Sequence, residues 1–338
     1  MPSRVVLLPG DGIGPEVARE ARLVLEQLVP DVEIVARPVG GAAIRATGSP
    51  FPDETRDACL ASVAVLKAPV GDPEFDGADV RPEQGLLALR AALDAYANLR
   101  PAVLGEVDVL IVRELVGGLY FGASGVREDG TAFDTCEYTP AQIERVVRRA
   151  FRLAQSRRGF VTSVDKANVL ETSRLWRRTV DRVAPDYPDV RYEHMLVDNA
   201  AMQLATNPEQ FDVLVTENMF GDILSDLAAA VTGGLGLAPS ASLSDGGPGI
   251  FEPVHGSAPD IAGKGIANPT AMLRSTALLL EYGLGLGGQA SRLSAAIDEA
   301  LKLAPTPDLG GTATTAELGE AVRGRLAVDG EAVPSYLA

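Results

Sequence analysis

The segment from Phe211 to Ala230 constrains the fold most strongly, because it joins a buried strand to a helix through a few polar residues. Val213–Thr216 is apolar and β-branched, which predicts a buried strand. Gly221 interrupts that pattern, and helical spacing is predicted from Asp222 onward. Asp222 and Asp226 are four residues apart, so they project from one face of the predicted helix.

The two aspartates on this predicted helix allow two interpretations. Like charges at this spacing repel each other by a few tenths of a kcal/mol on an isolated helix. A hard divalent cation would turn that repulsion into attraction, because Mg²⁺ favours one or two protein carboxylates together with water and substrate oxygens. For an arbitrary pair of this kind, a solvated helix face is the more common outcome. The rest of the chain must therefore decide between a metal site and a plain surface.

Composition excludes several classes of function. The chain has 338 residues, of which 46% are hydrophobic, which predicts a globular protein with two lobes. A net charge of −16 argues against nucleic acid or an anionic membrane as a partner. The two cysteines, Cys59 and Cys136, form neither a disulfide framework nor a zinc motif. With no visible signal peptide or membrane span, we expect a cytoplasmic protein.

The basic residues are mostly arginines. Only four of the 30 are lysines: Lys67, Lys166, Lys264 and Lys302. A lysine inside a polar motif is a candidate for proton chemistry, because it loses its proton far more readily than arginine does. Arg90, Arg100 and Arg113 stand at the ends of predicted elements. They could bind carboxylates bidentately, although ordinary surface pairing is an equally good interpretation.

Hydrophobic periodicity predicts the regular elements of the chain. Strands are expected over 4–9, 32–37, 63–66, 107–112, 161–164, 191–197 and 213–216. Helices are expected over 17–28, 53–61, 81–94, 140–157, 270–282, 290–303 and 315–325, with Trp176 packed on a further helix. The segment 96–101 is expected to end a helix at Pro101, 131–138 to form an exposed strand or arm, and 251–269 to be a long polar loop.

The glycine-rich segment after the first strand matches a dinucleotide fingerprint only in part. A strand, a glycine turn and a helix are the setting of that motif. Its third glycine is replaced by Pro15, which suits the first turn of a helix instead. Asp31, at the distance of a ribose-binding acid, would then be a false match. We therefore expect no ordinary Rossmann site here.

Two further segments have a structural and a functional interpretation. Glu83, Leu86, Leu87 and Arg90 share one face of a predicted helix, and alone they would indicate a core stripe with charged ends. His194 lies in an alternating apolar stretch, where a structural histidine with a satisfied partner is expected.

Several motifs together resemble one family, in the same order and over nearly the whole chain. They are LPGDGIGPE at 8–16, NLRP at 98–101, VRE at 112–114 with YFG at 120–122, SVDKANVL at 163–170, NMFGDILSD at 218–226 and HGSAPDIAGK at 255–264. The chain resembles the metal-dependent β-decarboxylating 2-hydroxyacid dehydrogenases, and within them most of all the isopropylmalate branch. The resemblance implies a two-lobed, non-Rossmann α/β fold with the active site in the cleft between the lobes. Residues 1–95 and 234–338 would form the NAD-binding lobe, and 96–233 the lobe for dimerisation and metal binding.

The resemblance also implies a reaction. Family members of this branch oxidise and decarboxylate 3-isopropylmalate to 4-methyl-2-oxopentanoate with reduction of NAD, in leucine biosynthesis. Asp222 and Asp226 of one subunit, with Asp198 of its partner in a homodimer, would bind Mg²⁺ or Mn²⁺. Lys166, also acting across the interface, would take the hydroxyl proton, and Tyr120 would protonate the enol carbon. The substrate would be bound by Glu83, Leu86, Leu87, Arg90, Arg100, Arg113 and Asp198.

The types of these residues suit that chemistry. A lysine beside a dication and arginines has its charged form disfavoured, as a base near neutral pH requires. By resemblance, Asp260 and Ile261 lie at the adenosine ribose. A carboxylate there accepts hydrogen bonds from a 2′-hydroxyl and repels a 2′-phosphate, so we expect NAD rather than NADP. The other cofactor positions would be Ile13, Asn168, Glu252, His255, Gly256, Ser257, Ala258, Asn268 and Asp308.

One segment departs from the isopropylmalate branch. Leu66–Pro73 lacks the usual glycine-rich sequence, and its Lys-Ala-Pro start is more similar to isocitrate enzymes. Homoisocitrate and tartrate or D-malate dehydrogenases therefore remain alternatives, although Glu83, Leu86 and Leu87 match the isopropylmalate branch. A non-enzymatic metabolite-binding relative is a further alternative. Nothing in the sequence supports it, because every matched chemical position carries the residue that the reaction requires.

Overall fold

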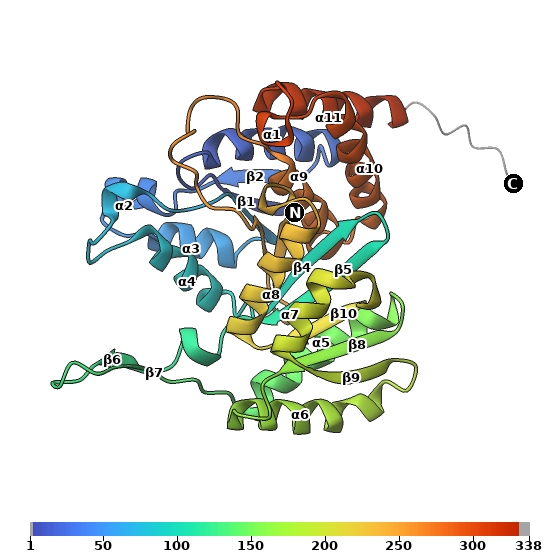
Figure 1. Cartoon of the computed structure of the whole chain (residues 1–338). Coiled ribbons are helices and arrows are strands. Elements are labelled where there is room, and N and C mark those ends of the chain that lie inside the picture. Colours follow the sequence, from blue (N-terminus) through green and yellow to red (C-terminus); the bar gives the residue numbers. More distant parts are fainter. Residues whose placement is uncertain (1–2, 331–338) are drawn as a thin grey trace, which may run out of the picture. The chain divides into compact units, whose positions relative to one another are not determined.

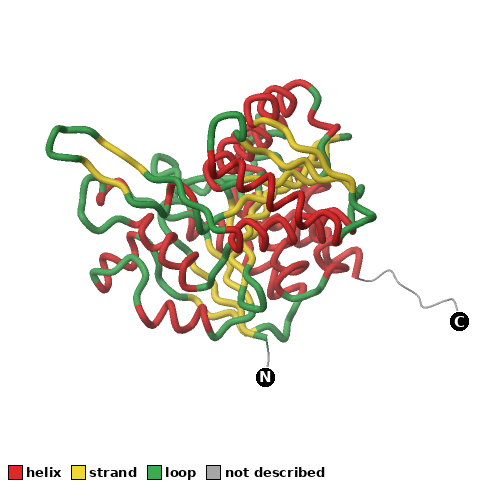
Figure 2. Tube along the Cα trace, turned by 90° about the horizontal axis from the view of Figure 1, so that it is seen from below, coloured by secondary structure: helices red, strands yellow, loops and turns green. Residues whose placement is uncertain are grey.

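The structure is a computed structural model that describes residues 3–330, and these form two compact units (Figure 1). Unit 1 contains residues 3–93, 236–241 and 245–330, and unit 2 contains Asp94–Leu235 and Ser242–Ser244. In both units helices cover strands, so the predicted α/β class is confirmed (Figure 2). Within residues 3–330, no helix combines the length and the apolar content needed to cross a bilayer.

Unit 1 is built on parallel strands. They are β2 (Glu33–Ala36), β1 (Arg4–Leu8), β3 (Ala64–Lys67) and β12 (Gly249–Pro253), paired in that order. The strand β12 corrects the prediction that a polar loop begins at Phe251. All five of its residues are buried, and the loop starts only at Val254. The acid and proline at the end of this strand conceal it, because both residues are rare in strands.

Seven α-helices belong to unit 1: α1 (Gly14–Leu28), α2 (Gly41–Thr47), α3 (Asp53–Leu60), α4 (Pro82–Ala92), α9 (Thr270–Leu278), α10 (Gly287–Leu303) and α11 (Thr315–Gly330). A π-helical turn, Leu279–Gly283, follows α9. The sequence did not predict α2, whose first turn has no local cap. Asp11, thirty residues earlier, accepts the N–H groups of Gly41 and Ala42 at 2.9 Å each. A partner so distant in the chain leaves no local capping signal.

Unit 2 contains the strands β4 (Ala97–Leu104), β5 (Val107–Glu114), β10 (Val213–Thr216), β8 (Phe160–Asp165) and β9 (Arg191–Leu196). The last four are parallel, while β4 and β5 form an antiparallel hairpin. The prediction that Tyr96–Pro101 ends a helix was wrong. Helix α4 already stops at Ala92, and Pro101 lies in β4 opposite Leu110. Proline fits there because its fixed φ is compatible with extended backbone.

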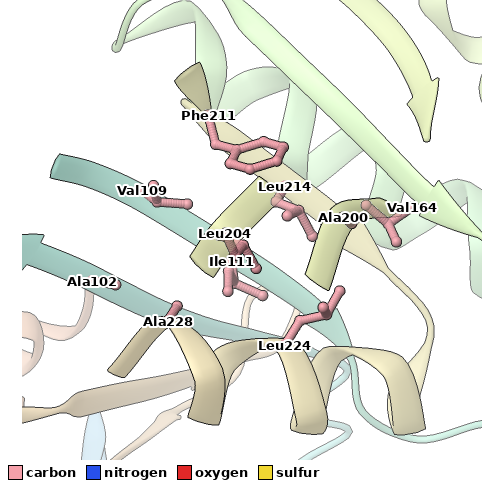
Figure 3. Close-up of a cluster of buried hydrophobic side chains, with 10 residues drawn as sticks. All are labelled: Ala102, Val109, Ile111, Val164, Ala200, Leu204, Phe211, Leu214, Leu224 and Ala228. Atoms are coloured by element: carbon pink, nitrogen blue, oxygen red, sulfur yellow. The ribbon is translucent and has the colours of Figure 1, made fainter. Parts of the chain in front are cut away.

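Four helices cover the strands of unit 2: α5 (Pro140–Gln155), α6 (Glu171–Val183), α7 (Val197–Thr206) and α8 (Asn218–Val231). Figure 3 shows how α7 and α8 pack on the strands, with Leu204 and Leu224 against Ile111 and Leu214. Since successive strand residues face opposite sides, Val213 and Val215 point to the other face, which α5 covers. The helix α8 and the strands β4 and β5, which carry the acidic and basic residues of the site described below, therefore belong to one packed layer.

Three smaller features of unit 2 were predicted from the sequence. An exposed hairpin of β6 (Ser124–Val126) and β7 (Ala132–Asp134) forms the expected arm (Figure 1). Trp176 is buried in packing, and its Nε1 donates to Ser163 Oγ at 3.2 Å. His194 Nε2 lies 2.9 Å from Asp181 Oδ1, which confirms a structural partner for this histidine.

Candidate active site

An acid–arginine cluster lies at the start of α8 in unit 2. Arg113, at the end of β5, is buried, and it donates from Nε and Nη2 to Asn218 Oδ1 at 3.0 and 2.7 Å. Its Nη1 donates to the carboxylate of Asp222, one helical turn further along α8. The arginine therefore lies along the first turn of the helix and presents its guanidinium beside the first of the two predicted metal-binding aspartates.

Gly221 makes this arrangement possible, and its role differs from the prediction. The helix begins at Asn218, so Gly221 lies inside α8 and does not interrupt it. The side chain of Glu217 caps the helix by accepting the N–H of Phe220 at 3.2 Å. A Cβ atom at position 221 would lie only 2.6 Å from Cγ and 2.7 Å from Cβ of Arg113. The glycine is therefore required for the close approach of the arginine to the helix.

Arg100 joins the two aspartates. It extends from β4, where Asn98 Oδ1 accepts its Nε at 2.9 Å. Its Nη2 donates to Asp222 Oδ1 at 3.3 Å and its Nη1 to Asp226 Oδ1 at 3.0 Å, while Ser225 Oγ accepts a further bond at 2.8 Å. The structure thus brings together Arg100, Arg113, Asp222 and Asp226, which the family resemblance assigns to substrate and metal binding.

Tyr120 borders the same cluster. It ends a short 3-10 helix, Gly118–Tyr120, and its hydroxyl donates to Asp222 Oδ2 at 3.2 Å. The guanidinium of Arg113 lies over its ring, 5.6 Å from the centroid. Partial burial, and next the negative charge of Asp222, raise the pKa of this phenol above its usual value. Tyr120 consequently keeps its proton at neutral pH and can donate it.

A second polar pair of unit 2 contains Lys166 and Asp198. Lys166 follows β8, Asp198 lies in the first turn of α7, and Lys166 Nζ is 2.6 Å from Asp198 Oδ1. The hydrogen bond from Lys166 lowers the pKa of the exposed Asp198 carboxyl. Among residues 3–330, no three acidic, histidine or cysteine side chains gather as a metal-binding group. Asp198 of a given chain is therefore not in the cluster that holds Asp222 and Asp226.

In unit 1, the glycine turn after β1 is filled by its own aspartate. Besides Gly41 and Ala42, Asp11 Oδ2 accepts the N–H of Gly71 at 3.0 Å. A Cβ on Gly12 would lie 2.1 Å from the carbonyl oxygen of Ser257. A phosphate has no access to these amides, because a carboxylate already accepts their hydrogen bonds. The geometry agrees with the expectation that this is not a Rossmann site.

A buried ion cluster lies at the ends of β3 and β12. Lys67 Nζ is 2.7 Å from Glu252 Oε2, and Arg90 Nη2 is 3.1 Å from Glu252 Oε1. Burial alone would raise the pKa of Glu252, but the charges of Lys67 and Arg90 outweigh it and lower the pKa to about 2. Glu252, predicted to bind the cofactor, and Arg90, predicted to bind the substrate, are thus paired with each other. The unusual Lys67 of the 66–73 segment adds a second cation to this pair, so Glu252 is held between two positive charges.

The predicted cofactor positions of unit 1 gather around the loop from 254 to 269. Ile13 donates its N–H to the carbonyl of Ser257 at 2.9 Å, and Asn268 Nδ2 donates to Asp308 Oδ2 at 3.0 Å. His255 is half-buried, desolvation of its ring lowers its pKa, and no partner is recorded for its Nε2. Asp260 and Gly256 are exposed, while Ala258 and Ile261 are half-buried. Asn168, also predicted to bind the cofactor, is an exposed residue of unit 2.

The substrate stripe on α4 is not a core stripe. Leu87 is 41% exposed and Leu86 is half-buried, whereas Leu89 of the same helix is fully buried. Glu83 is exposed, and its carboxylate approaches Gly71 together with the hydroxyl of Ser257. This face of α4 therefore presents two leucines and an acid beside the loop that carries the predicted cofactor positions.

Sequence reasoning missed the polar residues that orient the arginines. Asn98 lies two residues before Arg100 on the same side of β4, and Asn218 lies four residues before Asp222 on one face of α8. Those spacings were visible in the sequence, but nothing in them identifies an arginine 105 residues away as the partner of Asn218.

These features define a two-unit α/β protein with paired aspartates under two arginines and a separate lysine–aspartate pair, an arrangement suited to metal-assisted chemistry on a small polycarboxylate. The chain matches the family model described as isocitrate/isopropylmalate dehydrogenase over residues 4–322, and it belongs to this family.

Individual relatives support this assignment. The chain is 53% identical to a 3-isopropylmalate dehydrogenase of Shouchella clausii, covering 89% of this chain and 90% of the relative, and 47% identical to that of Streptococcus pneumoniae, covering 96% and 100%. Among solved structures, it resembles an isocitrate dehydrogenase from Methylococcus capsulatus (TM-score 0.89, 38% identity, 96% and 99% coverage). It also resembles a β-decarboxylating dehydrogenase from Thermococcus kodakarensis (TM-score 0.86, 38% identity, 98% and 100% coverage).

Proposed function

We propose that this protein is a 3-isopropylmalate dehydrogenase, which converts 3-isopropylmalate to 4-methyl-2-oxopentanoate with reduction of NAD in leucine biosynthesis. The observation that carries the proposal is the cluster of Arg100 and Arg113 on Asp222 and Asp226. Two guanidinium groups in a chain of net charge −16 form a local anion site, and two adjacent carboxylates form part of a cation site. A hydroxydiacid chelated to a divalent cation needs both.

The residues present fit Mg²⁺ or Mn²⁺. Asp222 and Asp226 offer hard oxygen ligands on one helix face, and Arg100 holds them close together. Asp198, 65% exposed at its side chain, would complete the set from the partner subunit. When bound, the ion would act as a Lewis acid that stabilises the enolate formed on loss of CO₂. The protein contributes the arginines, which hold the substrate carboxylates in one orientation.

Proton transfers are assigned to Lys166 and Tyr120. Lys166 would take the proton of the substrate hydroxyl, since an amine beside cationic groups more readily exists in its neutral form. Tyr120, protonated at neutral pH, would deliver a proton to the enol carbon. Its hydroxyl already lies against Asp222, at the edge of the substrate cluster. Tyr120 thus carries the protonation state that its step requires.

We assign NAD to unit 1. The exposed Asp260 would accept hydrogen bonds from the ribose hydroxyls, while Asn268 and Asp308, already bonded to each other, would complete that side. On α4, Leu86 and Leu87 would contact the isopropyl group, because exposed leucines without a core role can bury apolar substrate surface. Glu83 would lie between the substrate and the cofactor loop.

A homodimer is part of this proposal. Met202 on α7 and Ile223 on α8 are 56% and 59% exposed, on two helices that pack against each other. Large exposed apolar side chains on neighbouring helices favour an interface with a second copy. Pairing through α7 would also bring Asp198 and Lys166 of one chain to the neighbouring cluster, which neither residue joins within its own chain.

The test is a substrate panel. NADH formation is measured with 3-isopropylmalate, homoisocitrate, tartrate and D-malate, each with Mg²⁺ or Mn²⁺ and with NAD or NADP. We expect 3-isopropylmalate with NAD to give the highest kcat/KM. If the kcat/KM of another acid exceeds that of 3-isopropylmalate by about tenfold, the substrate assignment is wrong. A difference of that size is about what one apolar contact with the substrate provides.

Two substitutions test the roles of individual residues. Lys166→Met should lower kcat by about 100-fold or more, as expected for loss of a general base, while NADH binding to unit 1 stays unchanged. Asp226→Asn should raise the Mn²⁺ concentration needed for activity about tenfold or more. Undiminished turnover of Asp226→Asn at low Mn²⁺ would refute the metal assignment.

A further inference from the structure

Tyr138 follows β7 and precedes α5 in the chain, and its side chain is tightly enclosed. A Cβ on Gly117 would lie 2.7 Å from its Cε1, and one on Gly118 would lie 2.3 Å from its hydroxyl oxygen. On another side the ring meets Trp176 edge-on, with centroids 6.1 Å apart. These contacts hold the ring in one orientation, with the hydroxyl buried inside unit 2.

The hydroxyl of Tyr138 meets the first residue of α8 and two acids. It accepts the backbone N–H of Asn218 at 2.9 Å, and burial, together with the nearby carboxyl groups of Glu217 and Glu114, raises its pKa. A phenol has a single hydrogen, so it can donate to only one carboxylate. Burial raises the pKa of Glu114 to about 7 and also raises that of Glu217.

Each acid is fixed to backbone on its other side. Glu114 accepts the N–H groups of Val116 and Gly117 at 3.1 and 2.9 Å, and Glu217 caps α8 through Phe220. Tyr138 therefore connects the end of β5 to the start of α8. The N–H of Asn218 is one of the groups that a helix start leaves without an internal partner, and the phenol oxygen satisfies it.

The position of Asn218 controls Arg113. Both Nε and Nη2 of Arg113 donate to the one amide oxygen of Asn218, whose Nδ2 in turn donates to the carbonyl of Gly117 at 3.0 Å. The remaining guanidinium nitrogen, Nη1, meets Asp222. A shift of the first turn of α8 would therefore turn the guanidinium and move Asp222 together.

We propose that Tyr138, held between Glu114 and Glu217, is a positioning residue for the dehydrogenase reaction: it fixes Asn218, and through it Arg113 and Asp222, for substrate and metal binding. This inference rests on the proposed function. Tyr138 touches neither the arginines nor the predicted metal ligands in any recorded contact, so its effect is indirect.

The experiment compares Tyr138→Phe with a matched control, Tyr192→Phe, in the full-length protein. The hydroxyl of Tyr192 also bonds a carboxylate, Asp181 Oδ1 at 3.0 Å, but on β9 and α6. Tyr138→Phe leaves the N–H of Asn218 without its partner, so we expect KM for 3-isopropylmalate to rise about tenfold to 100-fold with a smaller change in kcat. KM for NAD should stay within about twofold, because NAD is assigned to unit 1. Tyr192→Phe should change neither constant.

A purely structural role would lower the melting temperature or the fraction of active enzyme and leave KM unchanged, and that result would overturn the proposal. Direct Mn²⁺ titration, followed by electron paramagnetic resonance, gives a readout independent of turnover, and weaker binding is expected for Tyr138→Phe. If the wild-type protein oxidises none of the acids in the panel, the proposed function fails. The positioning role is tested separately: equal Mn²⁺ affinities of the wild type and Tyr138→Phe would overturn it.

A second pair of variants covers the case in which Tyr138→Phe does not fold. Glu217→Gln keeps an oxygen for the N–H of Phe220 and gains an N–H that can donate to the phenol oxygen, so KM should stay within about threefold. Glu217→Ala removes both interactions and should raise KM for the acid about tenfold. Equal KM values for the Gln and Ala variants would overturn the proposal.

Discussion

The two units bury the same kind of side chain with opposite results. Glu252 of unit 1 and Glu114 of unit 2 are both nearly inaccessible to solvent. The pKa of Glu252 is lowered to about 2, because the charges of Lys67 and Arg90 outweigh its burial, whereas burial dominates at Glu114 and raises its pKa to about 7. Glu114 is bonded mainly to neutral partners, the N–H groups of Val116 and Gly117. Partners, not depth, decide whether a buried acid is charged.

The difference matches the role of each region. Unit 1 uses a permanently charged triad, in which the negative Glu252 orients a cation, Arg90. Unit 2 instead holds Arg113 on the neutral amide of Asn218 and on Asp222, while Glu114 accepts backbone N–H groups.

Removal of Lys67 should have the largest effect, because it would break the comparison outright. Lys67→Met leaves Glu252 buried with Arg90 as its only cation, and breaking a buried pair typically costs about 3–5 kcal/mol. Urea denaturation should show this loss in the free energy of unfolding. Lys302→Met, at a fully exposed position of unit 1, is the control and should leave stability unchanged. A Lys67 variant as stable as the control would contradict the account of the triad.

The pH dependence of stability should distinguish the two acids with an effect of similar size. The pKa of Glu114 is raised on folding, so its contribution is complete below about pH 4.5 and is lost as the pH rises through about 7, amounting to about 3 kcal/mol. The pKa of Glu252 is lowered, so its contribution is present above about pH 4.5 and is lost only toward pH 2.

The measurement is the free energy of unfolding of the wild type relative to Glu114→Gln and to Glu252→Gln between about pH 5 and pH 8. The advantage of the wild type over Glu114→Gln should shrink by about 3 kcal/mol across this range, and its advantage over Glu252→Gln should stay constant. Parallel curves for the two variants would show that Glu114 does not hold a proton near neutrality.

A smaller effect is expected from adding one methyl group to a helix of each unit. Gly221→Ala places a Cβ against Arg113 and should cost about 1–3 kcal/mol of stability while weakening substrate binding. Gly324→Ala in α11 meets nothing within 4 Å and should be neutral or stabilising by up to about 1 kcal/mol. Denaturation and KM measurements on both variants decide the point. Equal behaviour would mean that the contact with Arg113 is not tight.

Much of the fold could be predicted from periodicity, and the failures have physical causes. Strand β10 was predicted at its observed bounds because four buried β-branched and apolar residues leave little choice. Helix α2, strand β12 and the start of α8 were missed. The first is capped by a distant carboxylate, the second ends in an acid and a proline that are rare in strands, and the third contains a glycine that fits against Arg113. The assembled aspartates and arginines followed from family motifs, whereas Asn218 and Tyr138 act through contacts that no local pattern encodes.

The smallest change in stability is expected on the exposed face of α4. Leu87→Ala removes a half-exposed side chain and should change the free energy of unfolding by less than about 0.5 kcal/mol, whereas Leu89→Ala, at the fully buried position two residues later, should cost about 2–5 kcal/mol. If Leu87 contacts the isopropyl group, its loss should raise KM for 3-isopropylmalate severalfold through lost apolar contact and leave KM for D-malate unchanged, because D-malate lacks that group. Steady-state kinetics with both acids, beside urea denaturation, separate the two roles. An equal rise in both KM values would mean that Leu87 supports the site without contacting the isopropyl group. A large loss of stability would mean that Leu87 contributes to the core of unit 1.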